Sequence, residues 1–82
     1  MSTDAPAPYK TSEADLAKLQ SAFTYHAPKD DQPERYSELR GLAQRLAARM
    51  TELCPPSREL SLALTNLEQA TMWANAAIAR NE

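Results

Sequence analysis

The sequence has few of the residues on which several common folds and sites depend. Its 82 residues include one glycine, one cysteine, one histidine, and as aromatics only one Trp, three Tyr and one Phe. A β-sandwich needs many turns and turns favour glycine, so this composition predicts an all-α domain. One cysteine cannot form an internal disulfide, and one histidine with one cysteine argues against an all-protein zinc site. We therefore expect neither a metal ion nor a cofactor.

Long apolar runs and an excess of positive charge are also missing. No stretch approaches the ~20 apolar residues that cross a bilayer, and the N-terminus lacks the basic-then-apolar pattern of a secretory signal. We therefore expect a cytoplasmic protein with no membrane partner. The net charge is −2, whereas proteins that wrap polymeric nucleic acid usually carry a basic surface. The charge thus argues against a polymeric nucleic acid as partner.

The chain divides into a short tail and a helical region. Residues 1–11 are small, polar and proline-bearing, which is typical of a flexible arm, and Tyr9 is the one aromatic among them. Residues 12–82 should form a single domain. Its first helix begins near Ser12, because Ser12-Glu13-Ala14-Asp15 resembles a capping box with Asp in place of Glu. This helix is too short to be stable alone, so it must dock on another element.

Two long helices follow, separated by the prolines Pro55-Pro56. The second helix should run from Pro33 to about Leu53, and the third from Arg58 to about Arg80, with Ser57 as its N-cap. Apolar residues of the second helix recur at alternating spacings of three and four: Tyr36, Leu39, Ala43, Leu46, Met50 and Leu53. The third helix carries a matching seam: Leu60, Ala63, Leu64, Leu67, Ala70, Ala74, Ala77 and Ile78. The two seams predict an antiparallel helical hairpin.

The third helix has a second stripe, well round from this seam, that contains Leu62 and Trp73. A hairpin offers no intrachain surface for this stripe except the short first helix. Two interpretations stay open: the first helix packs on the stripe and Trp73 is core, or the stripe is a subunit interface. A chain this small buries little surface when alone. We therefore expect a homo-oligomer.

The sequence offers little material for catalysis. His26 is the only candidate base of the usual kind, and Cys54, the only thiol, continues the apolar face of the second helix. We expect Cys54 to be a small buried core residue. Gly41 falls inside the second helix, which excludes a glycine-rich phosphate loop. The remaining candidate acids lie among arginines on a solvated surface: Glu34, Glu38, Glu52 and Glu59. We expect Arg45 and Arg49 to be solvated or to pair with Glu38 and Glu52.

The loop from Thr24 to Gln32 is the segment densest in functional groups. Tyr25 and His26 supply flat rings, Pro28 a rigid apolar face and Lys29 an ammonium group, and a helix N-terminus follows. Rings and cations in one loop could stack a base and pair with a phosphate. Alternatively, the two rings hold the loop against the hairpin while Lys29 balances Asp30 and Asp31. The residues by themselves leave both interpretations open.

A resemblance to a known family rests on four segments, in order along the chain: Phe23–Gln32 (FTYHAPKDDQ), Arg35-Tyr36, Cys54–Glu59 (CPPSRE) and Met72–Glu82 (MWANAAIARNE). Over about residues 12 to 82 the chain resembles the phage anti-CBASS cyclic-oligonucleotide sponges, whose helical hairpin is shared with one class of anti-Thoeris sponges. Members of that family are compact hexamers that sequester the cyclic nucleotide messengers of bacterial immune systems. They bind cyclic dinucleotides and cyclic trinucleotides at distinct sites and do not cleave them.

The resemblance also implies roles for individual residues. Lys29 would contact a ligand phosphate, and Pro28 with Tyr25 and His26 would shape the pocket. An aromatic near the N-terminus stacks on a base in the family, and Tyr9 is the candidate here. A second site at a subunit junction would draw on three further candidates: Arg35, Arg58 and Asn66. The expected assembly is a homo-oligomer, a hexamer, in the cytoplasm of the infected bacterial host.

The sequence thus predicts a non-catalytic sponge for cyclic di- and trinucleotides. The rival interpretation is a protein-interaction adaptor, in which the stripe of Leu62 and Trp73 docks on a host protein and the loop is merely structural. A cyclic-nucleotide phosphodiesterase is disfavoured, because the chain has a single histidine and no carboxylate–histidine cluster for metal ions.

Overall fold

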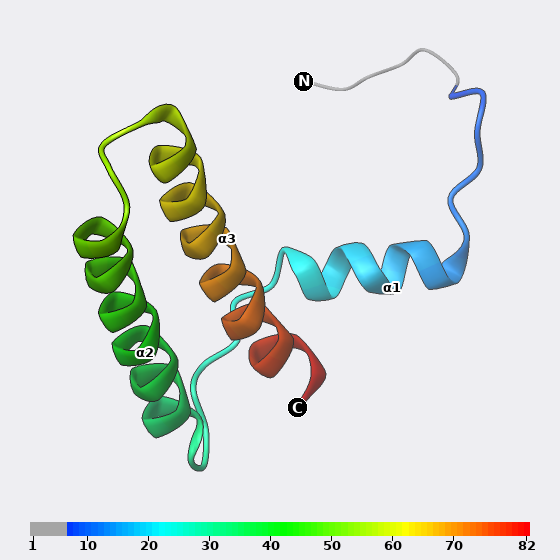
Figure 1. Cartoon of the computed structure of the whole chain (residues 1–82). Coiled ribbons are helices and arrows are strands. Elements are labelled where there is room, and N and C mark those ends of the chain that lie inside the picture. The colour runs from blue at the N-terminus through cyan, green and yellow to red at the C-terminus, as the bar shows by residue number, and fades with distance from the viewer. Residues whose placement is uncertain (1–6) are drawn as a thin grey trace.

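The computed structural model describes residues 7–82, which form three α-helices and, within that range, no strand. These are α1 (Glu13–Ala22), α2 (Gln32–Leu53) and α3 (Arg58–Asn81) (Figure 1). The predicted all-α fold class is therefore confirmed. Of the predicted arm, residues 7–11 form no helix and residues 1–6 lie outside the described range. None of the helices in the described range is long and apolar enough to cross a membrane.

The helices begin and end within a residue of their predicted positions, for the predicted reasons. The Ser12 hydroxyl accepts a hydrogen bond from the Asp15 N–H at 3.0 Å and so caps α1. Ser57 caps α3 in the same way, by accepting from the Leu60 N–H at 3.1 Å. Pro33 occupies the first turn of α2, where the missing N–H costs no helical hydrogen bond.

Helices α2 and α3 lie side by side and antiparallel, as the paired seams predict (Figure 1). Most seam residues are half-buried between the two helices: Tyr36, Leu39, Ala43, Met50, Leu60, Ala63, Leu64, Leu67, Ala74 and Ile78. Leu46 and Leu53, by contrast, are 51% and 67% exposed. The hairpin therefore buries its seam only in part.

The hairpin has no closed apolar core. Gln32, 3% exposed, is the one buried residue in the described range, and no apolar side chain there is buried. The radius of gyration is 18.4 Å, whereas a compact domain of this length would have about 12 Å. Open, largely apolar surfaces flank the seam on both sides. Leu42 and Ala70 lie on one flank, Leu64 and Met72 on the other.

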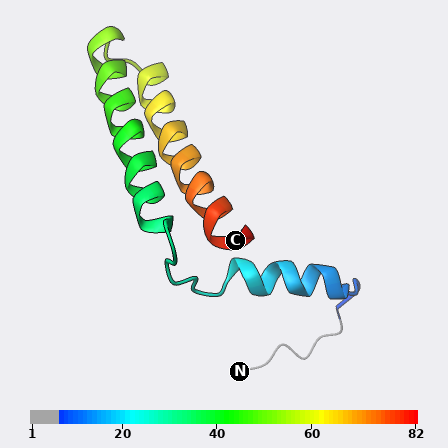
Figure 2. The same ribbon diagram turned by 90° about the horizontal axis from the view of Figure 1, so that it is seen from below.

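Helix α1 projects away from the hairpin, and only its C-terminal end lies beside the C-terminal end of α3 (Figure 2). None of its residues is buried. The interpretation that α1 packs on the second stripe of α3 is therefore wrong: Trp73 is 66% exposed and Leu62 44%. The physical reason is the extended loop after α1, which leads the helix away from the stripe. The Cζ of Arg80 lies 5.9 Å from the centre of the Trp73 ring.

Two further sequence predictions concern Cys54 and Arg49: the first is wrong and the second is confirmed. Cys54 is exposed and not buried, because α2 ends at Leu53 and the backbone at Cys54 is extended, which takes its side chain off the apolar face. The predicted surface pairing of Arg49 with Glu52 is confirmed, at 2.8 Å.

The exposed Trp73 generates a prediction about assembly. If copies of the chain associate through the second stripe, Trp73→Ala should remove a central aromatic contact, whose loss typically costs about 2 kcal/mol or more. We expect a smaller particle by light scattering and a lower melting temperature. Arg45→Ala, an exposed substitution on α2, should leave both unchanged. A Trp73→Ala protein of unaltered mass and melting temperature would exclude Trp73 from any interface or core.

Candidate functional site

The loop between α1 and α2 lies at the open end of the hairpin, where α2 begins and α3 ends (Figure 1). A tight turn ends this loop, because the Gln32 N–H donates to the Lys29 carbonyl oxygen at 2.9 Å. Asp30 within the turn has φ 53°, a left-handed conformation that Asp tolerates better than most residues. The turn brings Lys29 beside the end of α3.

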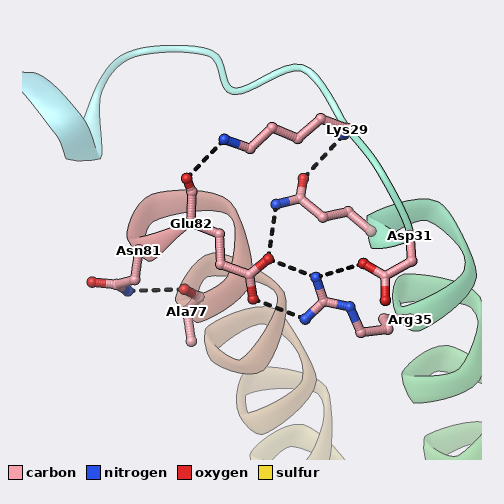
Figure 3. A network of polar contacts seen from close by, with 7 residues as sticks. Lys29, Asp31, Arg35, Ala77, Asn81 and Glu82 are labelled. Carbon is pink, nitrogen blue, oxygen red and sulfur yellow. Dashed lines mark hydrogen bonds and ion pairs between the residues drawn. The ribbon is translucent and has the colours of Figure 1, made fainter.

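Four side chains meet at this place and form what we call the Glu82 cluster: Lys29, Gln32, Arg35 and Glu82 (Figure 3). The Arg35 guanidinium donates from its two Nη atoms to the Glu82 carboxylate, at 2.8 and 2.6 Å. Lys29 Nζ donates to the main-chain oxygen of Glu82 at 2.8 Å. Cations from the loop and from α2 therefore converge on one acidic residue at the end of α3.

Gln32 is the buried centre of the cluster. Its amide oxygen accepts from the Lys29 N–H at 3.2 Å, and its amide nitrogen donates to Glu82 Oε1 at 3.2 Å. Both ends of the amide are thus used, as a buried polar group requires. Because Gln32 bonds to both sides, it fixes the position of the loop relative to the end of α3.

Within the cluster, Arg35 and Glu82 shift each other's pKa values. The hydrogen bonds from Arg35, followed by that from Gln32, lower the pKa of the Glu82 carboxyl to about 2. The bond to Glu82 likewise raises the pKa of Arg35 above its already high ordinary value. Asp31 also pairs with Arg35, at 3.0 Å. Two carboxylates, those of Asp31 and Glu82, therefore pair with Arg35.

An open groove with a volume of about 420 Å³ lies between the end of α1, the loop, α2 and the C-terminal part of α3. Rings, cations and an amide line this aromatic groove: Tyr25, His26, Tyr36, Arg40, Asn75 and Arg80. His26 is held in place by a 2.8 Å hydrogen bond between its Nε2 and the Ser21 carbonyl oxygen. Asn75 Oδ1 is buried and has no hydrogen-bond partner in the described range. The groove therefore combines surfaces for stacking with an unused acceptor.

The structure divides the predicted loop site into two parts. Tyr25 and His26 line the aromatic groove, whereas Lys29 belongs to the Glu82 cluster and Pro28 lies exposed between them. The alternative that Lys29 pairs with Asp30 and Asp31 is wrong, because Lys29 contacts Glu82 and Asp31 pairs with Arg35.

Other predicted site residues lie far apart within one chain. Tyr9 is 86% exposed and precedes α1, whose ten residues separate it from the loop by about 15 Å. Arg35, a candidate for the second site, lies with Lys29 in the Glu82 cluster. Arg58 begins α3 at the other end of the hairpin, about 35 Å away, and Asn66 is exposed midway along α3. A single chain does not bring Arg35, Arg58 and Asn66 together.

Sequence reasoning gave no role to Gln32 or Glu82, or to the arginines and Asn75 of the aromatic groove. A signal for the cluster was present in the hairpin itself. Folding the chain back at Pro55-Pro56 places residue 32 opposite about residue 79, so the start of α2 must meet the end of α3. What the pattern did not contain was which polar side chains would pair there.

The lowered pKa of Glu82 generates a pH prediction. Since the carboxyl has a pKa of about 2 when folded and 4.5 ordinarily, its stabilising contribution is complete above pH 4.5 and disappears as the pH falls through 2. Wild type should therefore melt at a higher temperature than Glu82→Gln at pH 6, and the two should converge near pH 2. Glu52→Gln, at a surface ion pair elsewhere, serves as the control. Equal melting temperatures of wild type and Glu82→Gln at pH 6 would contradict this account.

Comparison with known proteins bears directly on the proposed resemblance. A protein-family model described as "Acb2/Tad1, hairpin domain" matches residues 13–79, a stretch that includes the loop, the proline turn and nearly all of the three helices. No curated protein and no solved structure matches the chain significantly. The predicted resemblance is confirmed, and membership implies a phage anti-defence sponge for cyclic nucleotides that acts in the host cell by sequestration. The chain belongs to the Acb2/Tad1 hairpin-domain family.

Proposed function

We propose that this protein sequesters cyclic dinucleotides and cyclic trinucleotides without cleaving them, in the cytoplasm of an infected bacterium. One observation carries the proposal: Lys29 and Arg35 converge on Glu82, Lys29 on its main-chain oxygen and Arg35 on its carboxylate, at the hairpin end where the aromatic groove opens. A phosphodiester is a singly charged oxyanion, and both cations can donate charge-assisted hydrogen bonds to it. The bases of the same ligand would stack on Tyr25 and His26 in the aromatic groove.

Each part of the ligand has a partner at this end of the hairpin. The phosphate would bind Lys29, with Arg35 as a second donor. A base would enter the aromatic groove against Tyr25 and His26, and Pro28 would shape the wall between groove and cations. Stacking contributes roughly 1–3 kcal/mol per base in single-strand complexes. Asn75 lines the same groove and adds a polar side chain to it.

The site is incomplete in one chain, which supports a homo-oligomer. The groove is open, and the apolar flanks of the hairpin and the stripe of Trp73 are uncovered. Helix α1 carries Tyr9 outward, where it can stack on a base only in another copy of the chain. We expect a hexamer in which pockets form between subunits. Arg58 and Asn66 would then contribute to a separate trinucleotide site at another junction.

The residues at this end offer little for hydrolysis. His26 uses Nε2 on the Ser21 carbonyl oxygen, and the described range has no group of three or more acidic, His or Cys residues that could hold a metal ion. A ligand held by Lys29 and Arg35 would meet cations and rings, and the carboxylates nearby, Asp31 and Glu82, are held in ion pairs with Arg35. Binding without cleavage is the outcome that this set of residues supports.

A release experiment tests the proposed function directly. The protein is incubated with 3′,3′-cyclic di-AMP, washed free of unbound ligand and denatured by heat, and the supernatant is analysed by chromatography. We expect intact cyclic di-AMP in amounts comparable to the number of pockets. A linear product would identify an enzyme. If no cyclic di- or trinucleotide is captured, the sponge proposal fails and the adaptor interpretation gains support.

Lys29→Ala separates binding from folding. Lys29 Nζ is exposed and makes one hydrogen bond, so its loss should change the melting temperature little. The same change removes a cation from the phosphate, which costs about 1.5–3 kcal/mol, or roughly ten- to a hundredfold in dissociation constant per pocket. Calorimetry against cyclic di-AMP at fixed salt measures the effect. Lys18→Ala, an exposed lysine of α1, is the matched control. An unchanged dissociation constant in Lys29→Ala would remove Lys29 from the site.

A further inference from the structure

We propose that Glu82 is a built-in competitor of the ligand: its carboxylate occupies Arg35 and its main-chain oxygen occupies Lys29, so an incoming phosphate must displace it. This inference rests on the proposed function and adds a regulatory element to the same site. It assigns a role to a residue that lies beyond the family match, which ends at residue 79.

The hydrogen-bond donors of Lys29 and Arg35 are already engaged by Glu82. Both Nη atoms of Arg35 donate to the Glu82 carboxylate, and Nη2 also contacts Asp31 at 3.0 Å. Lys29 Nζ donates to the main-chain oxygen of the same residue. Figure 3 shows these donors turned toward Glu82. A phosphate that uses Arg35 and Lys29 must therefore take over bonds that Glu82 now accepts.

Charge repulsion also favours exchange of Glu82 for the phosphate over simultaneous binding. In the absence of ligand, the carboxylates of Glu82 and Asp31 both pair with Arg35. A phosphodiester that entered without displacing Glu82 would place a further negative charge among two carboxylates, and like charges at close range repel. Exchange of Glu82 for the phosphate keeps the balance. By thermodynamic reciprocity, the bond to Glu82 weakens ligand binding as much as the ligand weakens the bond.

Glu82 is placed where a phosphate can replace it. It follows Asn81, the last residue of α3, and its side chain remains 41% exposed. Release of the carboxylate breaks no hydrogen bond within α3, but it gives up the bonds from Arg35 and Gln32. An incoming phosphate can accept the same bonds, so the exchange leaves both donors on α2 paired.

This competition would act as a filter on the ligand. Free phosphate and other small anions gain only the contacts that Glu82 already provides, so they exchange one anion for another with little net benefit. A cyclic nucleotide adds stacking in the aromatic groove and can displace the carboxylate. The cluster would thereby exclude abundant simple anions while admitting a ligand that also has bases.

The test compares Glu82→Gln with wild type by calorimetry at pH 7 and fixed salt, using 3′,3′-cyclic di-AMP and inorganic pyrophosphate as probes. Gln keeps the size of the side chain but removes its charge. We expect Glu82→Gln to bind cyclic di-AMP about three- to tenfold more tightly, and to bind pyrophosphate at concentrations at which wild type does not. Glu52→Gln removes the same charge from a surface pair on α2 and should behave as wild type.

A second measurement follows the carboxylate itself. In wild type with carboxyl-¹³C-labelled glutamate, saturation with cyclic di-AMP should raise the pKa of Glu82 from about 2 toward its ordinary value of 4.5, because the carboxylate loses Arg35. This signal does not depend on the stability of any variant. Circular dichroism of Glu82→Gln establishes that its helices are intact.

The possible results separate this inference from the proposed function. If wild type binds cyclic di-AMP but Glu82→Gln binds it equally or more weakly, or the Glu82 signal stays fixed, the sponge stands and the competitor role is overturned. Weaker binding would make Glu82 a positioning residue for the cations. If only Glu82→Gln binds, the competitor role stands and sequestration by the natural protein fails. Absence of binding by both proteins overturns both.

Discussion

Two antiparallel helices can bury apolar side chains only along the line where they touch, and the rest of this structure depends on that limit. Neither flank of the α2–α3 seam is covered, so Leu42 and Met72 remain at the surface, and the described range contains no buried apolar residue. Helix α1 does not supply a third layer. Stability that a globular domain takes from its interior must here come from other contacts, which other copies of the chain can provide.

The two ends of the hairpin are closed by different chemistry. At one end Pro55-Pro56 and the Ser57 cap turn the chain through covalent geometry and one local hydrogen bond. At the other end no covalent link joins α2 to α3, and the Glu82 cluster makes the connection through a buried amide and an ion pair. Polar groups there hold the helices together and at the same time present cations. The end of the fold that is fastened by charge is thus also the end suited to bind an anion.

The fold was largely predictable from the sequence because its signals are local. Ser12 and Ser57 cap helices, Pro33 begins one, and the seams show a period that only a helical pair satisfies. The wrong predictions concern the docking of the short helix α1 and the burial of Cys54. The narrow apolar face of α1 does not determine where α1 docks, and the extended backbone at Cys54 outweighs the apolar period that predicts burial there. The residue types of the site were predictable, since Lys29, Tyr25 and His26 stand out in the loop sequence. The contacts of Lys29 and Arg35 with Glu82 were not, because they span about fifty residues and follow no periodic pattern.

The left-handed backbone of Asp30 has a consequence for how this loop can vary among related chains. The carboxylate of Asp30 makes no ion pair or hydrogen bond in the described range, so what position 30 contributes is its shape. Asn and Gly adopt the same conformation readily, whereas β-branched residues resist it by about 1–2 kcal/mol. The loop can therefore lose its charge at position 30 and keep Lys29 in place. Among related chains, we expect position 30 to hold residues that tolerate a left-handed backbone, whether or not they carry a charge. Uncharged Asn or Gly there would mark an intact site, and Val or Ile a distorted one.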